Sequence, residues 1–227
     1  MTRHRWMAAS WPMDASKLAK GLRTNPFDPE RASGFVVDRV RKTYVEARYV
    51  ERLEFDITDI DPFGEEFTTH QIQYKQYAFV ANTGESILEM VNEPRSSNVL
   101  ISSLSEVCGF RLTVEQSRVD ALQWLRLLER NSGEAWRVES LQLSGIRITP
   151  SISAKAVLSG TGNVVDSVSD LVGRKPHTID KIKARRTSDR RGAVILARDA
   201  VASVQGFGNE EQIVVQILRD TLGQAVM

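Results

Sequence analysis

Cysteine and histidine are scarce in this chain of 227 residues, which has one of the former and three of the latter. With Cys108 alone, no disulfide can form within the chain, and this is typical of proteins from a reducing compartment. We therefore expect a cytoplasmic location. His4, His70 and His177 show no H-x-x-x-H spacing, and there is no C-x-x-C pair, so the sequence argues against a zinc site.

Long apolar runs and the short motifs of common catalytic sites are also missing. No apolar stretch approaches the roughly 20 residues that cross a bilayer, so we expect no membrane segment. There is no G-x-S-x-G motif, and the apolar surroundings of Cys108 are typical of a core residue. The glycine pair in residues 160–165 (GTGNVV) lacks the rest of a phosphate loop and indicates a tight turn. The sequence thus predicts no cofactor and favours a non-enzymatic protein.

What the chain does have is charge that is segregated along the sequence, although its net charge is only +1. Residues 51–66 carry seven acidic side chains and one basic one, Arg52. Residues 174–191 carry eight basic side chains and two acidic ones. Such separation in a nearly neutral protein is typical of surfaces that meet a partner.

The basic segment predicts a β-hairpin that follows a phosphate backbone. Lys181 and Lys183 alternate with Ile182, so both lysines would point to one face of a strand, and arginines cluster near the expected tip. The basic N-terminal stretch would add to this surface. No aromatic residues interleave with the basic hairpin residues, which favours backbone contact with DNA or RNA without base readout. The predicted nucleic-acid-binding residues are Arg3, Arg5, Arg174, Lys175, Lys181, Lys183, Arg185, Arg186, Arg190 and Arg191. An ordinary solvated hairpin and a protein-docking surface are the alternatives.

The acidic segment allows three interpretations, of which a solvated turn is the simplest. A weaker one is a metal site for Mg²⁺ or Ca²⁺ built from Asp56, Asp59 and Asp61, which would make the protein a metal-dependent nuclease or phosphodiesterase. A calcium loop that begins at Asp59 fails, because Phe63 and His70 stand where oxygen donors are needed. The third interpretation is a docking surface that consists of Asp59, Asp61, Glu65 and Glu66.

Opposite charges on two parts of one chain also suggest self-assembly. The acidic segment of one copy would meet the basic segment of the next, and such head-to-tail contacts build rings or filaments. Our first functional expectation is a nucleic-acid-associated accessory subunit. The alternative is a self-assembling structural or adaptor subunit, so a protein partner or a homo-oligomer is expected beside the nucleic acid.

Hydrophobic periodicity predicts a mixed order of strands and helices. Alternation predicts strands in residues 50–62 (VERLEFDITDIDP) and 138–150 (VESLQLSGIRITP), two stretches that resemble each other. The three-residue spacing of leucines in residues 117–130 predicts a helix. Residues 85–94 are also expected to be helical, whereas residues 99–107 fit either a strand or a helix.

The fold class that follows is α+β, with duplicated ββα-type units that share one core. The similarity of the two strand segments, and Thr83-Gly84 and Thr161-Gly162 after the next strand, support this duplication. The expected domains are a flexible basic N-terminal arm in residues 1–33, a first α+β repeat in residues 34–133 and a second in residues 134–227. A short helix capped by Asp14 is expected within the arm, and an organelle transit peptide is the alternative for the chain's start.

Overall fold

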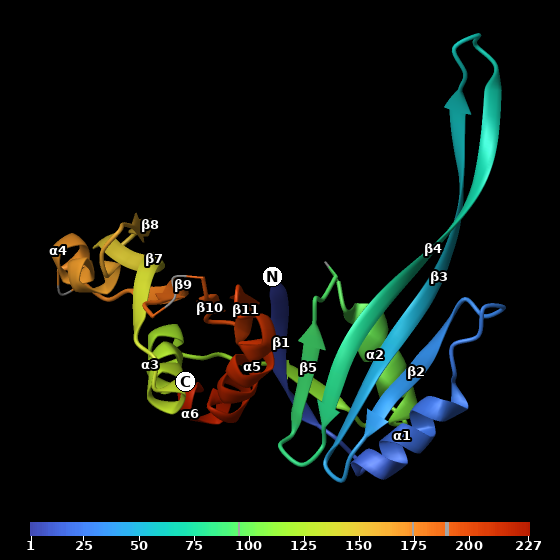
Figure 1. The fold of residues 1–227 in the computed structure, drawn as a ribbon, viewed down its shortest axis with the longest axis horizontal. Coiled ribbons are helices and arrows are strands. Elements are labelled where there is room, and N and C mark those ends of the chain that lie inside the picture. Colours follow the sequence, from blue (N-terminus) through green and yellow to red (C-terminus); the bar gives the residue numbers. More distant parts are fainter. Residues whose placement is uncertain (95, 174, 189–190) are drawn as a thin grey trace. The chain divides into compact units, whose positions relative to one another are not determined.

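The computed structural model describes residues 1–94, 96–173, 175–188 and 191–227. The chain forms two compact units: unit 1 combines residues 1–7 with residues 116–227, and unit 2 consists of residues 8–115. Both units are α+β, with antiparallel strands and few helices (Figure 1). The α+β class expected from the sequence is therefore confirmed. Among the described residues, no helix is long and apolar enough to cross a bilayer.

Unit 1 is built on one antiparallel sheet in the order β1, β11, β10, β9, β7, β8. Its strands are β1 (Thr2–Ser10, of which the first part belongs here), β7 (Trp136–Thr149), β8 (Ile152–Ser159), β9 (Thr178–Arg186), β10 (Ala193–Ala197) and β11 (Val201–Gln205). Its helices are α3 (Ala121–Ser132), α4 (Val168–Val172), α5 (Glu211–Asp220) and α6 (Leu222–Ala225), with the short 3₁₀ turns η1 (Val164–Ser167) and η2 (Gly208–Glu210).

The helices α3 and α5 pack on one face of this sheet. Asp120 caps α3 by accepting the backbone N–H groups of Leu122 and Gln123, so the predicted helix begins where an N-cap residue occurs. Trp124 of α3 and Ile182 and Leu196 of the sheet are fully buried in this core. Side chains alternate along each strand, so the residues between these core positions face the other side of the sheet, which α3 and α5 do not cover.

The N-terminus is a sheet strand, and the prediction of a flexible arm is wrong. Strand β1 pairs antiparallel with β11, with Arg3 opposite Ser203 and Arg5 opposite Val201. Trp6 is completely buried and packs edge-to-face on Trp124, with ring centroids 5.5 Å apart. The burial of so large a ring fixes this segment in the core. The helix predicted from Asp14 is confirmed as α1 (Ala15–Thr24).

The strands of unit 2 also pair antiparallel, in the order β2, β3, β4, β5. Its strands are β2 (Ser33–Val40), β3 (Tyr44–Ile60), β4 (Glu66–Asn82) and β5 (Ile87–Val91), and the short strand β6 (Thr113–Gln116) ends the unit. Helix α1 packs on β2 and β3, and α2 (Asn98–Val107) packs on α1. Residues 99–107, which the sequence left open, are thus helical.

The strands β3 and β4 form a ribbon that extends beyond the rest of unit 2 (Figure 1). Strand β2 pairs with β3 as far as Glu51, and β5 pairs with β4 only from Ala78 onward. Residues 52–60 and 66–76 therefore pair only with each other within unit 2. We call this segment, residues 52–76, the distal hairpin.

The helix predicted in residues 85–94 is wrong, because Ile87–Val91 forms strand β5. Ser86 and Asn92 both have positive φ angles, +57° and +50°, which interrupt any helix and bracket a five-residue strand. The first predicted repeat thus continues with a strand after Thr83-Gly84, whereas the second continues with η1 and α4 after Thr161-Gly162. The duplication of ββα units is not confirmed.

Candidate nucleic-acid interface

The predicted basic hairpin is formed by β9 and β10, and it divides its basic residues between two faces. Lys181, Lys183 and Arg185 share one face of β9, opposite the buried side chain of Ile182. Arg186 points the other way: its Nη1 lies 2.6 Å from Oε2 of Glu210, and its guanidinium lies over the ring of Phe207. Lys175 and Arg191 are exposed outside the strands. Arg174 and Arg190 lie outside the described residues.

Strand pairing brings the N-terminal arginines to the same face as the hairpin lysines. Arg3 lies in one cross-strand row with Ser203, Ile195 and Lys183, and Arg5 in the next row with Val201, Ala197 and Lys181. Residues that are directly opposite in antiparallel strands point to the same side. The surface that results, which we call the basic face, has six basic side chains: Arg3, Arg5, Arg137, Lys181, Lys183 and Arg185.

The side chains in the middle of the basic face are small or aliphatic. Strands β10 and β11 place Ala193, Ile195 and Ala197 beside Val201 and Ser203 there, and Ala193, Val201 and Ser203 are buried. The basic side chains of β1 and β9 stand on either side of this strip, about 14 Å apart at three strand spacings. Two rows of cations with a low strip between them can contact two segments of a polyanion, or the two sides of one groove.

Glu139 also belongs to this face, and three of the basic side chains surround it. Its carboxylate accepts hydrogen bonds from Nε of Arg185 at 2.7 Å and from Nη2 of Arg137 at 3.1 Å, and Nζ of Lys183 lies 3.8 Å away. The hydrogen bond from Arg185 is the main cause that lowers the pKa of Glu139, and the same bond raises the pKa of Arg185. The cluster keeps one negative charge against three positive ones.

A cavity of about 550 Å³ opens at the edge of the basic face next to this cluster. Arg137, Glu139 and Lys183 line it together with the hydroxyl-bearing residues Ser140, Ser159 and Thr161, and with Gly160. The first glycine of the pair that we interpreted as a tight turn therefore lies beside two cations and one carboxylate. Hydroxyl groups and cations are common partners of phosphate oxygens. Arg137 was not among the predicted residues, although the alternation in the strand from Trp136 could have placed it with Glu139.

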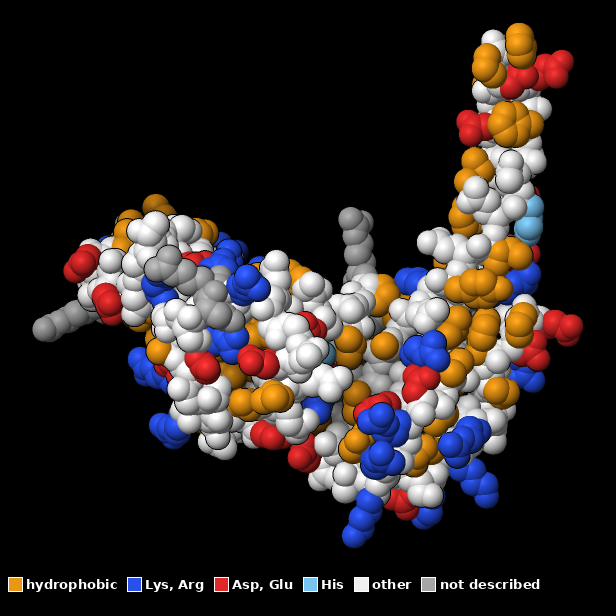
Figure 2. Space-filling model, in the orientation of Figure 1, with side chains coloured by type: hydrophobic (Ala, Val, Ile, Leu, Met, Phe, Trp, Pro, Cys, Tyr) orange, Lys and Arg blue, Asp and Glu red, His pale blue; other side chains and the backbone are white. Residues whose placement is uncertain are grey.

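The acidic segment forms the outer part of the distal hairpin. Asp61 stands at the turn, where its Oδ1 accepts the backbone N–H groups of Phe63 and Glu65, both at 2.8 Å. Asp59 and Glu66 belong to opposite faces of the ribbon, since Asp59 pairs with Phe67 and Glu66 with Ile60. The predicted docking residues thus gather at the free end, where Figure 2 shows acidic side chains beside hydrophobic ones.

The same geometry gives the metal site no support. Asp56 contacts Nδ1 of His70 at 2.9 Å on one face of the ribbon, Asp59 lies on the other face, and Asp61 is used by the turn. Across the described ranges, no three side chains of His, Cys, Asp or Glu come together in a way that could hold a metal ion. Cys108 is buried beside helix α2, and burial raises the pKa of its thiol.

The distal hairpin exposes apolar side chains that sequence analysis assigned to a half-buried strand. Leu53, Phe55 and Ile57 are between 37% and 40% exposed on one face, and Phe63 at the turn is 91% exposed. An isolated two-stranded ribbon is at best marginally stable in water, and exposed apolar patches usually mark contact surfaces. Comparison with known proteins adds no assignment, since neither a family model nor a curated protein matches the sequence.

Proposed function

We propose that this protein is a nucleic-acid-associated accessory subunit that contacts the phosphate backbone with its basic face. The observation that carries this proposal is the strand register, which unites Arg3 and Arg5 with Lys181 and Lys183 on one face of unit 1. These residues are about 180 positions apart in the sequence, so a surface made of both is a product of the fold. Two rows of cations can contact several phosphate groups along a nucleic-acid backbone.

The chemistry of the face points to backbone contact without sequence readout. The six side chains are lysines and arginines, which bind phosphate oxygens, and the residues between them are small or aliphatic. No aromatic ring belongs to the rows described above, so bases have no stacking platform there. Binding is therefore expected to depend strongly on salt and weakly on sequence.

The test is a titration of labelled DNA and RNA, followed by fluorescence anisotropy at several salt concentrations. The double variant Lys181→Gln/Lys183→Gln removes two cations from the centre of the face. It should weaken binding and lower the slope of log K against log salt by about 2. The matched control is Lys17→Gln/Lys20→Gln, which removes the same charge from exposed positions of α1. Equal binding by the parent and by K181Q/K183Q would refute the proposal.

A second candidate function, self-assembly, is favoured by a different observation, the exposure of the distal hairpin. Its free end combines Phe63 with the carboxylates of Asp61, Glu65 and Glu66. The occupant we propose is the basic face of a second copy, whose excess of positive charge complements this end. The contact would be head-to-tail and would therefore produce rings or filaments rather than a two-fold dimer.

The two candidates use the same basic face and are separated by one measurement. Size-exclusion chromatography with light scattering at low and high salt gives the mass, and the ratio of absorbance at 260 and 280 nm gives the nucleic-acid content. Co-purified nucleic acid that is released by salt supports the first function. A nucleic-acid-free particle that dissociates in salt, and that charge reversal of Glu65 and Glu66 also dissociates, supports the second. A monomer without affinity for nucleic acid contradicts both.

A further inference from the structure

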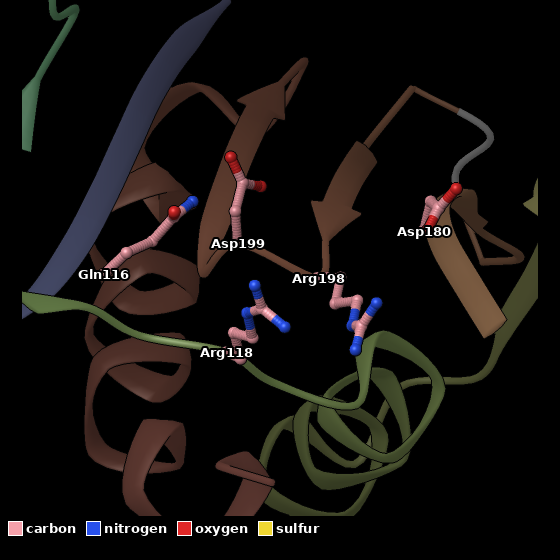
Figure 3. Close-up of a pocket in the computed structure, with 5 residues that line it drawn as sticks. All are labelled: Gln116, Arg118, Asp180, Arg198 and Asp199. Atoms are coloured by element: carbon pink, nitrogen blue, oxygen red, sulfur yellow. The ribbon is translucent and has the colours of Figure 1, made fainter. Parts of the chain in front are cut away.

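A separate pocket of unit 1 lies at the end of the sheet where β10 turns into β11. It has a volume of about 260 Å³ and is lined by Gln116, Arg118, Asp180, Arg198 and Asp199. Figure 3 shows that these side chains come from three parts of the chain: the segment before α3, strand β9, and the β10–β11 turn. At about 30 Å³ for each water molecule, the pocket has room for about nine waters, which is more than a bare inorganic ion occupies.

Backbone hydrogen bonds hold the two arginines of the pocket in place. The N–H of Val119 donates to the carbonyl of Arg198, and the N–H of Arg198 donates to the carbonyl of Asp180, both at 2.9 Å. The N–H of Met227 donates to the carbonyl of Arg118 at 3.0 Å. Both arginines thus extend from backbone that is tied to neighbouring segments, which makes their positions preorganised for a ligand.

Neither guanidinium group forms an ion pair among the residues that the structure describes, although two carboxylates, those of Asp180 and Asp199, line the same pocket. No carboxylate of the described chain lies within 4 Å of Arg118 or Arg198 in an ion pair, and the Nε–H of Arg198 is shielded from solvent without an acceptor. Both residues line the same pocket, as Figure 3 shows. Arg118 is exposed and Arg198 is half-buried. The shielded Nε–H of Arg198 without an acceptor is costly, and a bound anion would relieve this cost.

The two aspartates of the pocket are already engaged. Asp199 lies 3.6 Å from Nη2 of Arg5, and Oδ1 of Asp180 accepts a hydrogen bond from the hydroxyl of Ser144 at 2.8 Å. Their carboxylates point away from the space between the arginines in Figure 3. They line the pocket without an ion pair to Arg118 or Arg198, and their remaining lone pairs can accept hydrogen bonds from ligand hydroxyl groups.

We propose that this pocket binds a small phosphate monoester that carries hydroxyl groups, a compound of the sugar-phosphate class. A phosphate monoester bears close to two negative charges at neutral pH, which matches two unpaired guanidinium groups, and the planar fork of arginine suits phosphate oxygens. Gln116 and the two aspartates supply partners for hydroxyl groups, and among the described residues no aliphatic or aromatic side chain lines the pocket to select an apolar compound. This inference does not depend on the basic face.

Isothermal titration calorimetry with ribose 5-phosphate, inorganic phosphate, succinate and ribose tests the proposal. We expect ribose 5-phosphate to bind more tightly than inorganic phosphate, succinate to bind weakly and ribose not to bind. Arg118→Gln and Arg198→Gln should each lower the affinity at least about tenfold, since each removes charge-assisted hydrogen bonds. Arg126→Gln, at an exposed position of α3 outside the pocket, is the matched control and should bind like the parent.

Two further measurements make the outcome decisive. Affinity should fall as pH decreases from about 7.5 to about 5.5, because the phosphate gains its second proton near pH 6. Circular dichroism confirms that the variants are folded, and Arg198→Lys, which keeps the charge but loses the fork, should bind with intermediate affinity. No binding at about 10 mM ribose 5-phosphate, unchanged binding by R118Q and R198Q, or equal binding of succinate would overturn the assignment. The variant K181Q/K183Q should bind ribose 5-phosphate with the affinity of the parent. A failure of the proposed nucleic-acid binding can therefore be distinguished from a failure of the proposed phosphate pocket.

Discussion

Glu139 of strand β7 and Arg185 of strand β9 form an ion pair, with Nε of Arg185 2.7 Å from the Glu139 carboxylate. This contact decides how much of the positive charge of the basic face is available to a polyanion. Because Arg137 and Lys183 also contact Glu139, three of the six cations share one carboxylate. The face keeps a positive excess, since Arg3, Arg5 and Lys181 lie outside the group of cations around Glu139.

The variant Glu139→Gln should therefore bind nucleic acid more tightly while being less stable. Removal of the charge frees Arg185, Arg137 and Lys183 to contact phosphate, so the salt slope should become steeper. The same change leaves partly buried cations without their partner and should lower the free energy of unfolding by about 1–3 kcal/mol at pH 7. Urea unfolding and fluorescence anisotropy measure the two effects. A variant that is less stable without tighter binding would contradict the role given to the basic face.

The stabilisation from Glu139 should also depend on pH in a defined direction. Its pKa in the folded protein is lowered, chiefly by the hydrogen bond from Arg185. The stabilisation is therefore complete above the unfolded-state pKa of about 4.3 and is lost as pH falls through the folded-state value. Urea unfolding at pH 7 and near pH 3.5 should show that the difference between the parent and E139Q shrinks in acid. A difference that stays constant would contradict this ion pair as its cause.

Trp6 provides the test of the N-terminal strand. Trp6→Ala removes a fully buried ring that packs on Trp124, and such a change should cost about 3–5 kcal/mol. Arg3→Ala, at an exposed position of the same strand, is the control and should change stability by less than about 0.5 kcal/mol. Urea unfolding of the two variants gives the answer. Equal free energies of unfolding for W6A and the parent would support the original prediction of a flexible N-terminal arm.

The elements with strong local patterns could be predicted from the sequence, and the others could not. Helix α3 has a leucine periodicity, so its existence and its buried face could be predicted, whereas the predicted start at residue 117 lies before Asp120, the N-cap that the structure shows. Strand β1 also alternates over its first residues, with His4 and Trp6 buried and Arg3 and Arg5 less buried, but its high charge suggested a solvated arm. Strand β5 is five residues long, and a segment of that length has no periodicity that separates a strand from a helix.

For the candidate sites, too, local sequence patterns could predict single strands but not which distant residues lie together. The lysines of β9 were readable because alternation in one strand is a local property. Their union with Arg3 depends on the order β1, β11, β10, β9, and strand order is set by contacts between distant segments. Arg118 and Arg198 carry no motif at all, since each is a single arginine in its own segment. Only the fold brings them to one pocket.

A substitution of Phe63, at the turn of the distal hairpin, can distinguish an effect on assembly from an effect on folding. Phe63→Ser should leave the free energy of unfolding within about 0.5 kcal/mol of the parent, because the ring is 91% exposed. If the hairpin end docks on a second copy, the same variant should lower the mass measured by light scattering. The control is Phe110→Ser, which removes an exposed phenylalanine outside the hairpin. An unchanged mass for F63S, in a parent that does assemble, would exclude this contact.

Cys108 should be inert in the folded protein. Its side chain is 1% exposed, and burial raises the pKa of the thiol, so little of the reactive thiolate is present or accessible at neutral pH. Iodoacetamide should therefore label Cys108 in urea but not in native buffer, as mass spectrometry can measure. Fast labelling of the native protein would show that the α2 region opens readily.

Substitution by alanine should change the stability of the protein by very different amounts at two glycines that have similar φ angles. Gly206 has φ +80° and Gly64 has φ +92°, so both pay the strain of a left-handed alanine, which is about 1–2 kcal/mol. At Gly64, in the hairpin turn, a Cβ atom meets nothing within 4 Å. At Gly206 it would lie 2.2 Å from the carbonyl oxygen of Arg191, a backbone atom that must then move.

Gly206→Ala should consequently destabilise the protein by clearly more than Gly64→Ala, and thermal unfolding measures both. Because Gly206 precedes Phe207, whose ring packs under Arg186, the shift should also disturb the contact between Arg186 and Glu210. The basic face lies on the other side of β9, so G206A that still folds should keep its affinity for nucleic acid. A loss of nucleic-acid binding in folded G206A would move the proposed interface to the Arg186 side of the sheet.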